Sequence, residues 1–233
     1  MRSWLRLATL DEKSLARTAR THADRLVFDL ACIGPQEPSR SRNECAAFLR
    51  LSQGLRRYVV VHDFASGECE DDLAAIFAEG PDGIILAGAQ NGAEIQRLDV
   101  LLSTLEAVND VPLGRTRIVA RCDTAAGILG AASYRAKSER LEAVGWSPVA
   151  LANEIGATDT YAADGRLIAP LQQAQGLIQL AAAAAGVAAL AADEGLVDAE
   201  VFSPRCREAR AVGFAGMMTS DPARVAIINQ VFG

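Results

Sequence analysis

Arg121 and Asp123 are the two residues whose types and spacing most clearly allow chemistry. They stand at the end of Arg117–Cys122, an apolar run that is typical of a β-strand. Because side chains alternate along a strand, positions 121 and 123 point to the same side. A guanidinium that lies within about 4–6 Å of a carboxylate competes with a divalent ion for its oxygens. The spacing therefore predicts that Arg121 serves as the counter-charge of Asp123 in place of a metal. The alternative is that Arg121 faces a helix end or solvent.

Two further residues are catalytic candidates. His62 follows three valines and precedes Asp63. At the carboxyl end of a strand such a histidine can act as a general base, although a histidine beside a loop is more often a simple hydrogen-bonding residue. Asp29 ends the run Arg25–Asp29, where it either takes part in catalysis or forms a salt bridge inside a barrel mouth. His22, by contrast, falls on an expected helix and is interpreted as structural.

Short apolar runs alternate with amphipathic runs about eight times along the chain. This alternation predicts parallel strands joined by helices. For a chain of 233 residues it favours one closed (β/α)₈ TIM barrel that spans residues 1–233. The strands are expected at Trp4–Leu7, Arg25–Asp29, Tyr58–His62, Gly83–Leu86, Arg117–Cys122, Leu141–Val144, Gly186–Leu190 and Gly213–Met217. The helices are expected at Glu12–Ala23, Ser41–Gln53, Asp71–Ala78, Gly92–Ala107, Ala125–Tyr134, Leu167–Ala185, Pro204–Ala211 and Pro222–Val231.

The composition excludes several classes of protein. The net charge of −6 argues against nucleic acid as a partner. The tightest cationic cluster, Arg56-Arg57, is expected to be a solvated helix end. No membrane partner is expected, because the most apolar stretch, Leu177–Ala192, consists mainly of alanine and Gly186 interrupts it. The five cysteines are scattered without a CxxC pair, so they indicate neither disulfides nor a zinc site. A cytoplasmic location is therefore expected.

The segments Arg2–Leu5, 23–30 and Asp123–Gly127 are the main ones in which this sequence resembles the HpcH/HpaI aldolase and citrate lyase β-subunit family, in consistent order over nearly the whole chain. The opening Arg2-Ser3-Trp4-Leu5 resembles that family's RS-x-L start, and 23–30 (ADRLVFDL) is similar to its ADAVILDLED strand. Asp123-Thr124-Ala125-Ala126-Gly127 resembles its ETARG turn. The other similar segments are 81–86, 181–187, 213–216 and 221–229.

The resemblance implies a barrel that carries Mg²⁺ at the carboxyl ends of its strands. There the metal would hold a small carboxylate or an acyl-CoA substrate while a carbon–carbon bond breaks or forms. Asp123 matches the family's metal-binding glutamate. The resemblance also implies a symmetric homo-oligomer. In relatives the C-terminal helix often packs on a neighbouring subunit, and this chain is shorter there.

The chain departs from the family pattern where the chemistry is expected. The second metal ligand matches Ala150, which has no oxygen in its side chain. The arginine that holds the substrate matches Val60, and two lysines match Gly88 and Met217. These losses remove positive charge and one ligand together, so the family mechanism is not expected to operate intact.

Three functions remain open from the sequence. The first is a carbon–carbon lyase or aldolase in which Asp123 holds the metal with help from Asp29, His62 or Glu154. The second is a non-catalytic relative that binds a small acid or serves in assembly. The third is a different barrel enzyme, such as a phosphate-binding isomerase, which would need Gly213–Gly216 as its phosphate loop.

Overall fold

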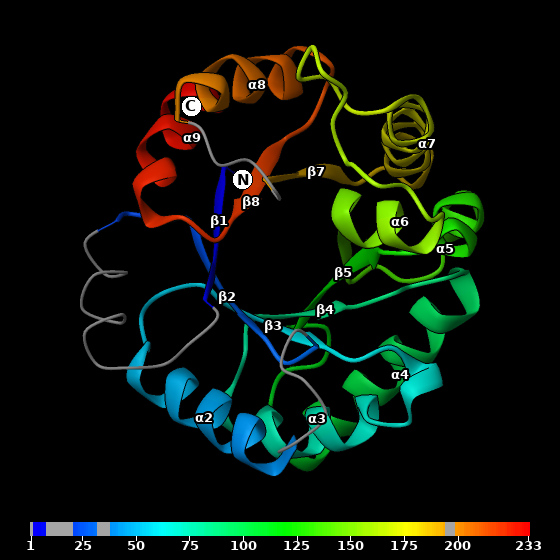
Figure 1. Ribbon diagram of the computed structural model, residues 1–233. Helices are drawn as coiled ribbons and strands as arrows, with labels where there is room; N and C mark the ends of the chain where they lie inside the picture. Colours follow the sequence, from blue (N-terminus) through cyan, green and yellow to red (C-terminus); the bar gives the residue numbers. More distant parts are fainter. Residues whose placement is uncertain (1, 8–20, 32–37, 194–198) are drawn as a thin grey trace.

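The computed structural model describes residues 2–7, 21–31, 38–193 and 199–233. In this part of the chain, parallel strands form a closed barrel in sequence order, and helices surround it (Figure 1). This confirms the expected (β/α)₈ barrel. The strands are β1 (Ser3–Leu7), β2 (Arg25–Asp29), β3 (Arg57–Val61), β4 (Gly83–Leu86), β5 (Arg117–Cys122), β6 (Leu141–Trp146), β7 (Ala188–Asp193) and β8 (Gly216–Thr219).

The helices follow the strands with four short 3₁₀ turns between them. They are α2 (Pro38–Leu51), α3 (Cys69–Ile76), α4 (Gly92–Val108), α5 (Ala125–Gly130), α6 (Pro148–Glu154), α7 (Ala169–Ala185), α8 (Ala199–Ala211) and α9 (Val225–Val231). The 3₁₀ turns are η1 (Phe64–Ser66), η2 (Phe77–Glu79), η3 (Ala131–Tyr134) and η4 (Pro222–Arg224). Most of the expected helix Glu12–Ala23 lies outside the described residues.

Local sequence signals explain most of these boundaries. Asp221 caps η4, because its carboxylate accepts a hydrogen bond from the Ala223 N–H at the start of that turn. The expected strand at Gly186–Leu190 begins two residues too early, because Gly186 adopts φ 73° and ends α7. Helix α6 was not expected, although Ser147 caps it and a proline follows at its first position.

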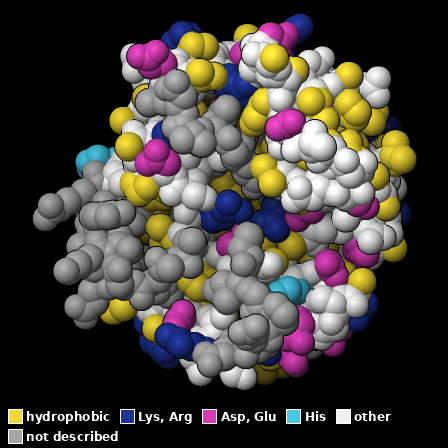
Figure 2. All heavy atoms as spheres, viewed as in Figure 1, with side chains coloured by type: hydrophobic (Ala, Val, Ile, Leu, Met, Phe, Trp, Pro, Cys, Tyr) yellow, Lys and Arg dark blue, Asp and Glu magenta, His cyan; other side chains and the backbone are white. Residues whose placement is uncertain are grey.

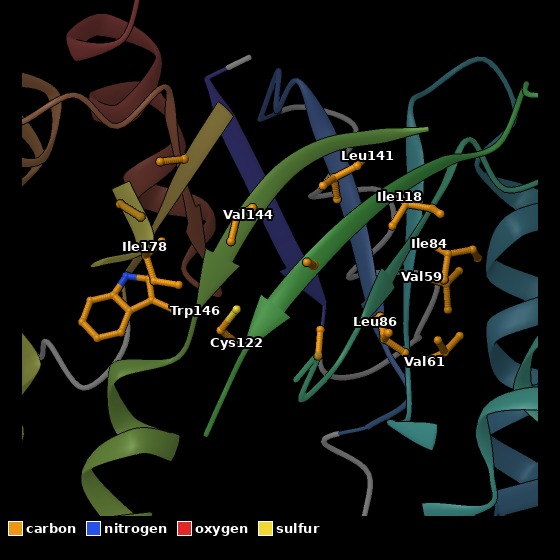
Figure 3. Close-up of a cluster of buried hydrophobic side chains, with 14 of the residues drawn as sticks. Val59, Val61, Ile84, Leu86, Ile118, Cys122, Leu141, Val144, Trp146 and Ile178 are labelled. Carbon is orange, nitrogen blue, oxygen red and sulfur yellow. The ribbon is translucent and has the colours of Figure 1, made fainter. Parts of the chain in front are cut away.

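The barrel has two apolar cores that follow the alternation of side chains along each strand. The outer core lies between strands and helices and includes Val59, Val61, Ile84 and Cys122 (Figure 3). The inner core fills the barrel. Its members include Trp4, Val27, Tyr58, Val60, Ile85, Val119 and Leu190. Arg6, Asp29 and Arg121 each stand two positions beyond an inner member, and they therefore point into the mouth of the barrel.

Two expectations about basic residues are wrong. Arg57 is not part of a solvated helix end: it begins β3, is 7% exposed, and donates hydrogen bonds to the carbonyl oxygens of Leu49 and Gly80. His22 does not lie on a helix. It occupies a turn before β2 with φ 55°, and its carbonyl oxygen accepts a hydrogen bond from Asn229.

The thiols agree with the expectation that they form no disulfide. Cys45, Cys69, Cys122 and Cys206 are buried and free, while Cys32 lies outside the described residues. In the described part of the chain, none of the helices combines the length and the apolar character needed to cross a bilayer.

Candidate functional site

Arg121 lies across the mouth of the barrel and joins two aspartates. From β5, its Nε lies 2.8 Å from Oδ2 of Asp123, and its Nη1 lies 3.0 Å from Oδ2 of Asp29 at the end of β2. The expected pairing of Arg121 with Asp123 is therefore present. The salt bridge that was the alternative for Asp29 is present as well. The arginine side chain is 12% exposed and Asp29 is 2% exposed, so the ion pairs are largely shielded from water.

A second arginine enters the same mouth from β1. Nη1 of Arg6 lies 3.4 Å from Oδ2 of Asp29, and its Nε donates to the hydroxyl of Ser220, just after β8. Acidic and basic side chains accordingly lie together in the hollowed centre of the face that Figure 2 shows. Two arginines and two aspartates give this mouth a formal charge of zero. We call these four residues, Arg6, Asp29, Arg121 and Asp123, the mouth cluster.

Asp123 is also held by the backbone of the neighbouring strand connection. The N–H of Gly88 donates to Oδ2 at 3.1 Å, the same oxygen that Arg121 contacts. Oδ1 of Asp123 is buried and has no hydrogen-bond partner among the described residues. Gly88 adopts φ 57°, and a Cβ there would lie 3.3 Å from Cβ of Asp63. This backbone favours glycine, which explains why no lysine stands at this position.

The donor atoms at this end of the barrel do not fit Mg²⁺, which prefers several oxygen ligands in an octahedron. The guanidinium of Arg121 already neutralises Asp123. Position 150 on α6 carries only a methyl group, and the carboxylate of Glu154 accepts a hydrogen bond from the N–H of Ala125. Within the described ranges, no group of three or more His, Cys, Asp or Glu side chains is placed to hold a metal ion.

His62 pairs with an aspartate, but not with the one expected. Its Nδ1 lies 2.7 Å from Oδ2 of Asp72 in the first turn of α3, and its backbone N–H donates to the same oxygen. Asp63 instead accepts from the N–H of Ser66 and caps η1. It is the spacing of Asp72 from Cys69 and Leu73, both buried, that signals an inward side chain.

A cavity of about 270 Å³ lies beside the barrel, between α7 and α8 over the end of β7. Its aromatic and apolar walls include Trp146 and Phe202, and the guanidinium of Arg205 lies 4.0 Å from the ring centre of Tyr161. A gap of about 10 Å³, the room of one water molecule, shares Trp146 with this cavity and reaches Arg121. Sequence reasoning missed this cavity because it depends on how two helices pack.

Gly213–Gly216 does not form the phosphate loop that an isomerase would need, and it leads into β8 instead. Gly213 lies between α8 and the first residue of β8, Gly216. In a barrel of parallel strands this connection lies at the amino ends, opposite the face where the mouth cluster stands. The two glycines therefore cannot form a phosphate site at the carboxyl ends.

Known proteins with similar sequences come from one family. Residues 2–222 match the HpcH/HpaI aldolase/citrate lyase family. A (3S)-malyl-CoA thioesterase of Cereibacter sphaeroides is 28% identical over 99% of this chain and 76% of its own length. A citrate lyase subunit beta of Leuconostoc mesenteroides is 28% identical over 90% of this chain and 69% of its own length.

Solved structures of 22–23% identity share the fold. The citrate lyase β subunit from Mycobacterium tuberculosis has a TM-score of 0.81 and covers 100% of this chain and 96% of that chain. Protein CitE from the same organism, in complex with magnesium and acetate, has a TM-score of 0.82 over 99% of this chain and 90% of that chain. Since the family match spans nearly all of the sequence, the chain belongs to the HpcH/HpaI aldolase/citrate lyase family.

Proposed function

We propose that the carboxyl end of this barrel binds a small carboxylate, free or as its acyl thioester, through Arg121 and without Mg²⁺. The observation that carries this proposal is the position of the guanidinium between Asp29 and Asp123. Arg121 supplies the fixed positive charge that the resemblance assigns to the metal. Guanidinium groups suit this role because their donors form a fork that matches a carboxylate.

Electrostatics support a guanidinium at this point rather than a divalent ion. Arg6 and Arg121 both contact one oxygen, Oδ2 of Asp29. Two guanidinium groups therefore converge at that corner of the mouth, and a carboxylate placed there is attracted by both arginines. A divalent cation would meet the same two arginines as like charges, and it would have to replace a 2.8 Å contact with Asp123.

The ligand class follows from the relatives. One is described as a (3S)-malyl-CoA thioesterase, and CitE structures are described as complexes with acetate, acetoacetate and pyruvate. All these ligands carry either a carboxylate or an acyl group. The cavity beside β7 offers room for the part of a ligand that extends beyond its acid group. Metal-dependent carbon–carbon cleavage does not follow for this chain, because the donor atoms at its barrel mouth do not fit Mg²⁺.

Thermal melting tests the proposal in six conditions: EDTA alone, millimolar Mg²⁺ alone, and each of malate and acetoacetate with EDTA and with Mg²⁺. Ligand binding at ten times Kd stabilises a protein by about 1.4 kcal/mol. For a chain of this size the Tm should then rise by about 3–6 °C. The acids are expected to give this shift equally with EDTA and with Mg²⁺. Arg121→Gln should abolish the shift, whereas Arg40→Gln, at an exposed arginine that pairs with Glu44 on α2, should keep it.

Arg121→Lys controls for a folding defect of Arg121→Gln, because lysine keeps the positive charge but lacks the forked donors of the guanidinium. It should retain a reduced shift. A rise in Tm with Mg²⁺ alone would show that the mouth cluster binds the metal despite its ion pairs, and it would refute the proposal. A failure of all acids to raise the Tm of the native protein would leave assembly as the role of the scaffold.

A further inference from the structure

We infer that His62 and Asp72 form a proton-accepting pair, which gives the barrel a general base for the hydrolysis of an acyl thioester bound at its mouth. This inference rests on the proposed function, because it takes the bound acyl group from there. The geometry that carries it is the 2.7 Å contact between Nδ1 of His62 and a carboxylate that is 1% exposed.

Both carboxylate oxygens of Asp72 are held by neighbouring side chains or backbone groups. Its Oδ2 accepts from the backbone N–H of His62 and contacts the imidazole, and its Oδ1 accepts from Nε of Arg42 at 2.8 Å. Nη2 of Arg42 also pairs with Glu68, just before α3. Both carboxylate oxygens of Asp72 thus face N–H donors, one from the guanidinium and one from the backbone. Asp72 therefore acts as an acceptor only.

The carboxylate of Asp72 fixes the tautomer of the histidine. Nδ1 must carry the proton in order to donate to Asp72, so the lone pair of the neutral ring stands on Nε2. The side chain of His62 is 25% exposed, in contrast to its partner. This arrangement orients a proton acceptor away from the buried carboxylate and leaves it within reach of water.

The chain also brings His62 to the end of the barrel where the mouth cluster stands. Val60 pairs with Asp29 in the β2–β3 register and belongs to the inner core. His62 follows it by two residues, about 7 Å further along the chain direction. The next residue, Asp63, lies against Gly88, whose N–H holds Asp123. The histidine and the proposed acyl site thus share one end of the molecule.

The reaction that this pair serves balances with water as the only co-reactant. A water oxygen attacks the carbonyl carbon of the thioester while Nε2 takes one of its protons. The carbon–sulfur bond then breaks, its electron pair leaves with the sulfur, and the imidazolium returns the proton to the thiolate. The products are the free acid and the thiol.

The tautomer can be observed directly, because the chain has only two histidines. A long-range ¹H–¹⁵N spectrum of the full chain shows two imidazoles, and His22→Gln assigns them. We expect His62 to carry its proton on Nδ1 in the native protein. Asp72→Asn should remove this preference, since an amide can also donate to Nδ1. A native spectrum with the proton on Nε2 would overturn the inference.

Activity gives the second readout, with malyl-CoA and acetyl-CoA as probes and thiol release as the signal. A positioned general base contributes about 10²–10⁴-fold to rate, so His62→Gln should lower kcat at least about 100-fold. Asp72→Asn should lower kcat with little change in KM, whereas His22→Gln should leave both unchanged. Equal rates for native and His62→Gln protein would overturn the inference, as would native protein that releases no thiol from either probe.

The failure of this inference can be told apart from that of the proposed function. If malate still raises the Tm of the native protein while no thiol is released, the proposed carboxylate site is supported and the inferred general base is refuted. If malate gives no shift, the proposed function itself fails. His62→Gln should keep the malate-induced shift, because Arg121 rather than the histidine holds the acid.

Discussion

Asp123 is one methylene shorter than the glutamate that the resemblance assigns to its position. Oδ2 of the shorter side chain meets the guanidinium of Arg121 and the N–H of Gly88, two donors that hold it on one side. Arg121 in turn divides its charge between this aspartate and Asp29. Arg121 therefore compensates the negative charge of both aspartates. Stability and site geometry are linked at this residue.

Removal of Asp123 should show this dependence. Asp123→Ala in metal-free protein is expected to lower the free energy of unfolding by about 1–3 kcal/mol, because it breaks a largely buried charge-assisted hydrogen bond. Urea unfolding measures the change. Asp164→Ala is the matched control, since it removes an exposed pair with Arg166 and should leave stability unchanged. A more stable Asp123→Ala protein would mean that Asp123 is an uncompensated inward charge.

The sequence predicted the Arg121–Asp123 pair but not the partner of His62, and the difference is physical. Two residues apart on a strand, the first pair is fixed by the alternation of side chains alone. Asp72 stands ten residues after His62, on a helix that must turn back over β3 before the two side chains meet. No periodicity in the sequence predicts where that helix packs, so the sequence favoured the adjacent Asp63 as the partner of His62.

Among the elements, α4 is tied to the barrel by a buried carboxylate at its C-terminal end. Glu106 is fully buried, and its oxygens accept from Arg140 before β6 and from the N–H groups of Gly114 and Thr116 before β5. Burial alone would raise the pKa of Glu106. The hydrogen bonds from Arg140 and the two backbone groups outweigh burial and lower that pKa. Glu106 therefore stays charged in the folded protein.

This lowered pKa predicts a pH dependence of stability. A group whose pKa falls on folding contributes fully above its unfolded pKa, here about 4.3, and the contribution disappears as pH falls through the folded value. Glu106→Gln should cost about 3–5 kcal/mol at pH 7. The difference from the native protein should shrink below about pH 4. Urea unfolding at several pH values measures it, and a difference that stays constant down to pH 3 would contradict the assignment.

The sequence predicted interior strands better than the last ones. The runs at β2, β4 and β5 coincide with the expected bounds, because both faces of these strands are apolar and turn residues bound them. At β7 the strand consists mainly of alanine, as does the end of the preceding helix, so hydrophobicity alone could not locate the boundary. Only the conformation of Gly186 does so. Helix α6 was missed because seven residues are too few for a helical period to stand out.

For the molecule as a whole, the buried thiols report on global unfolding. Burial raises the pKa of Cys69 and of Cys122 to about 12 and that of Cys206 to about 11, and it raises the pKa of Cys45 further still. The reactive thiolate is therefore scarce at each of these positions near neutral pH. All four lie in the outer core between strands and helices.

A thiol reagent such as DTNB at pH 8 tests this expectation. In Cys32→Ser protein, the four described cysteines should react only as fast as the chain unfolds. Labelling rates should therefore be the same for all four and should rise together with urea. Rapid labelling of any one of them without denaturant would show a local opening of the outer core and would contradict this description.

Because the barrel is closed, β1 can complete its pairing only after β8 has been synthesised. β1 pairs with β8, and Asn229 of α9 holds both the Ser3 hydroxyl and the turn at His22, so α9 lies beside the first strand (Figure 1). During synthesis, β1 leaves the ribosome about 210 residues before its second neighbour exists. The nascent chain must carry an open sheet edge for most of that time. A circularly permuted gene that joins the native ends by a short linker and opens the chain after α5 should therefore still encode a closed barrel, but one assembled in a different order.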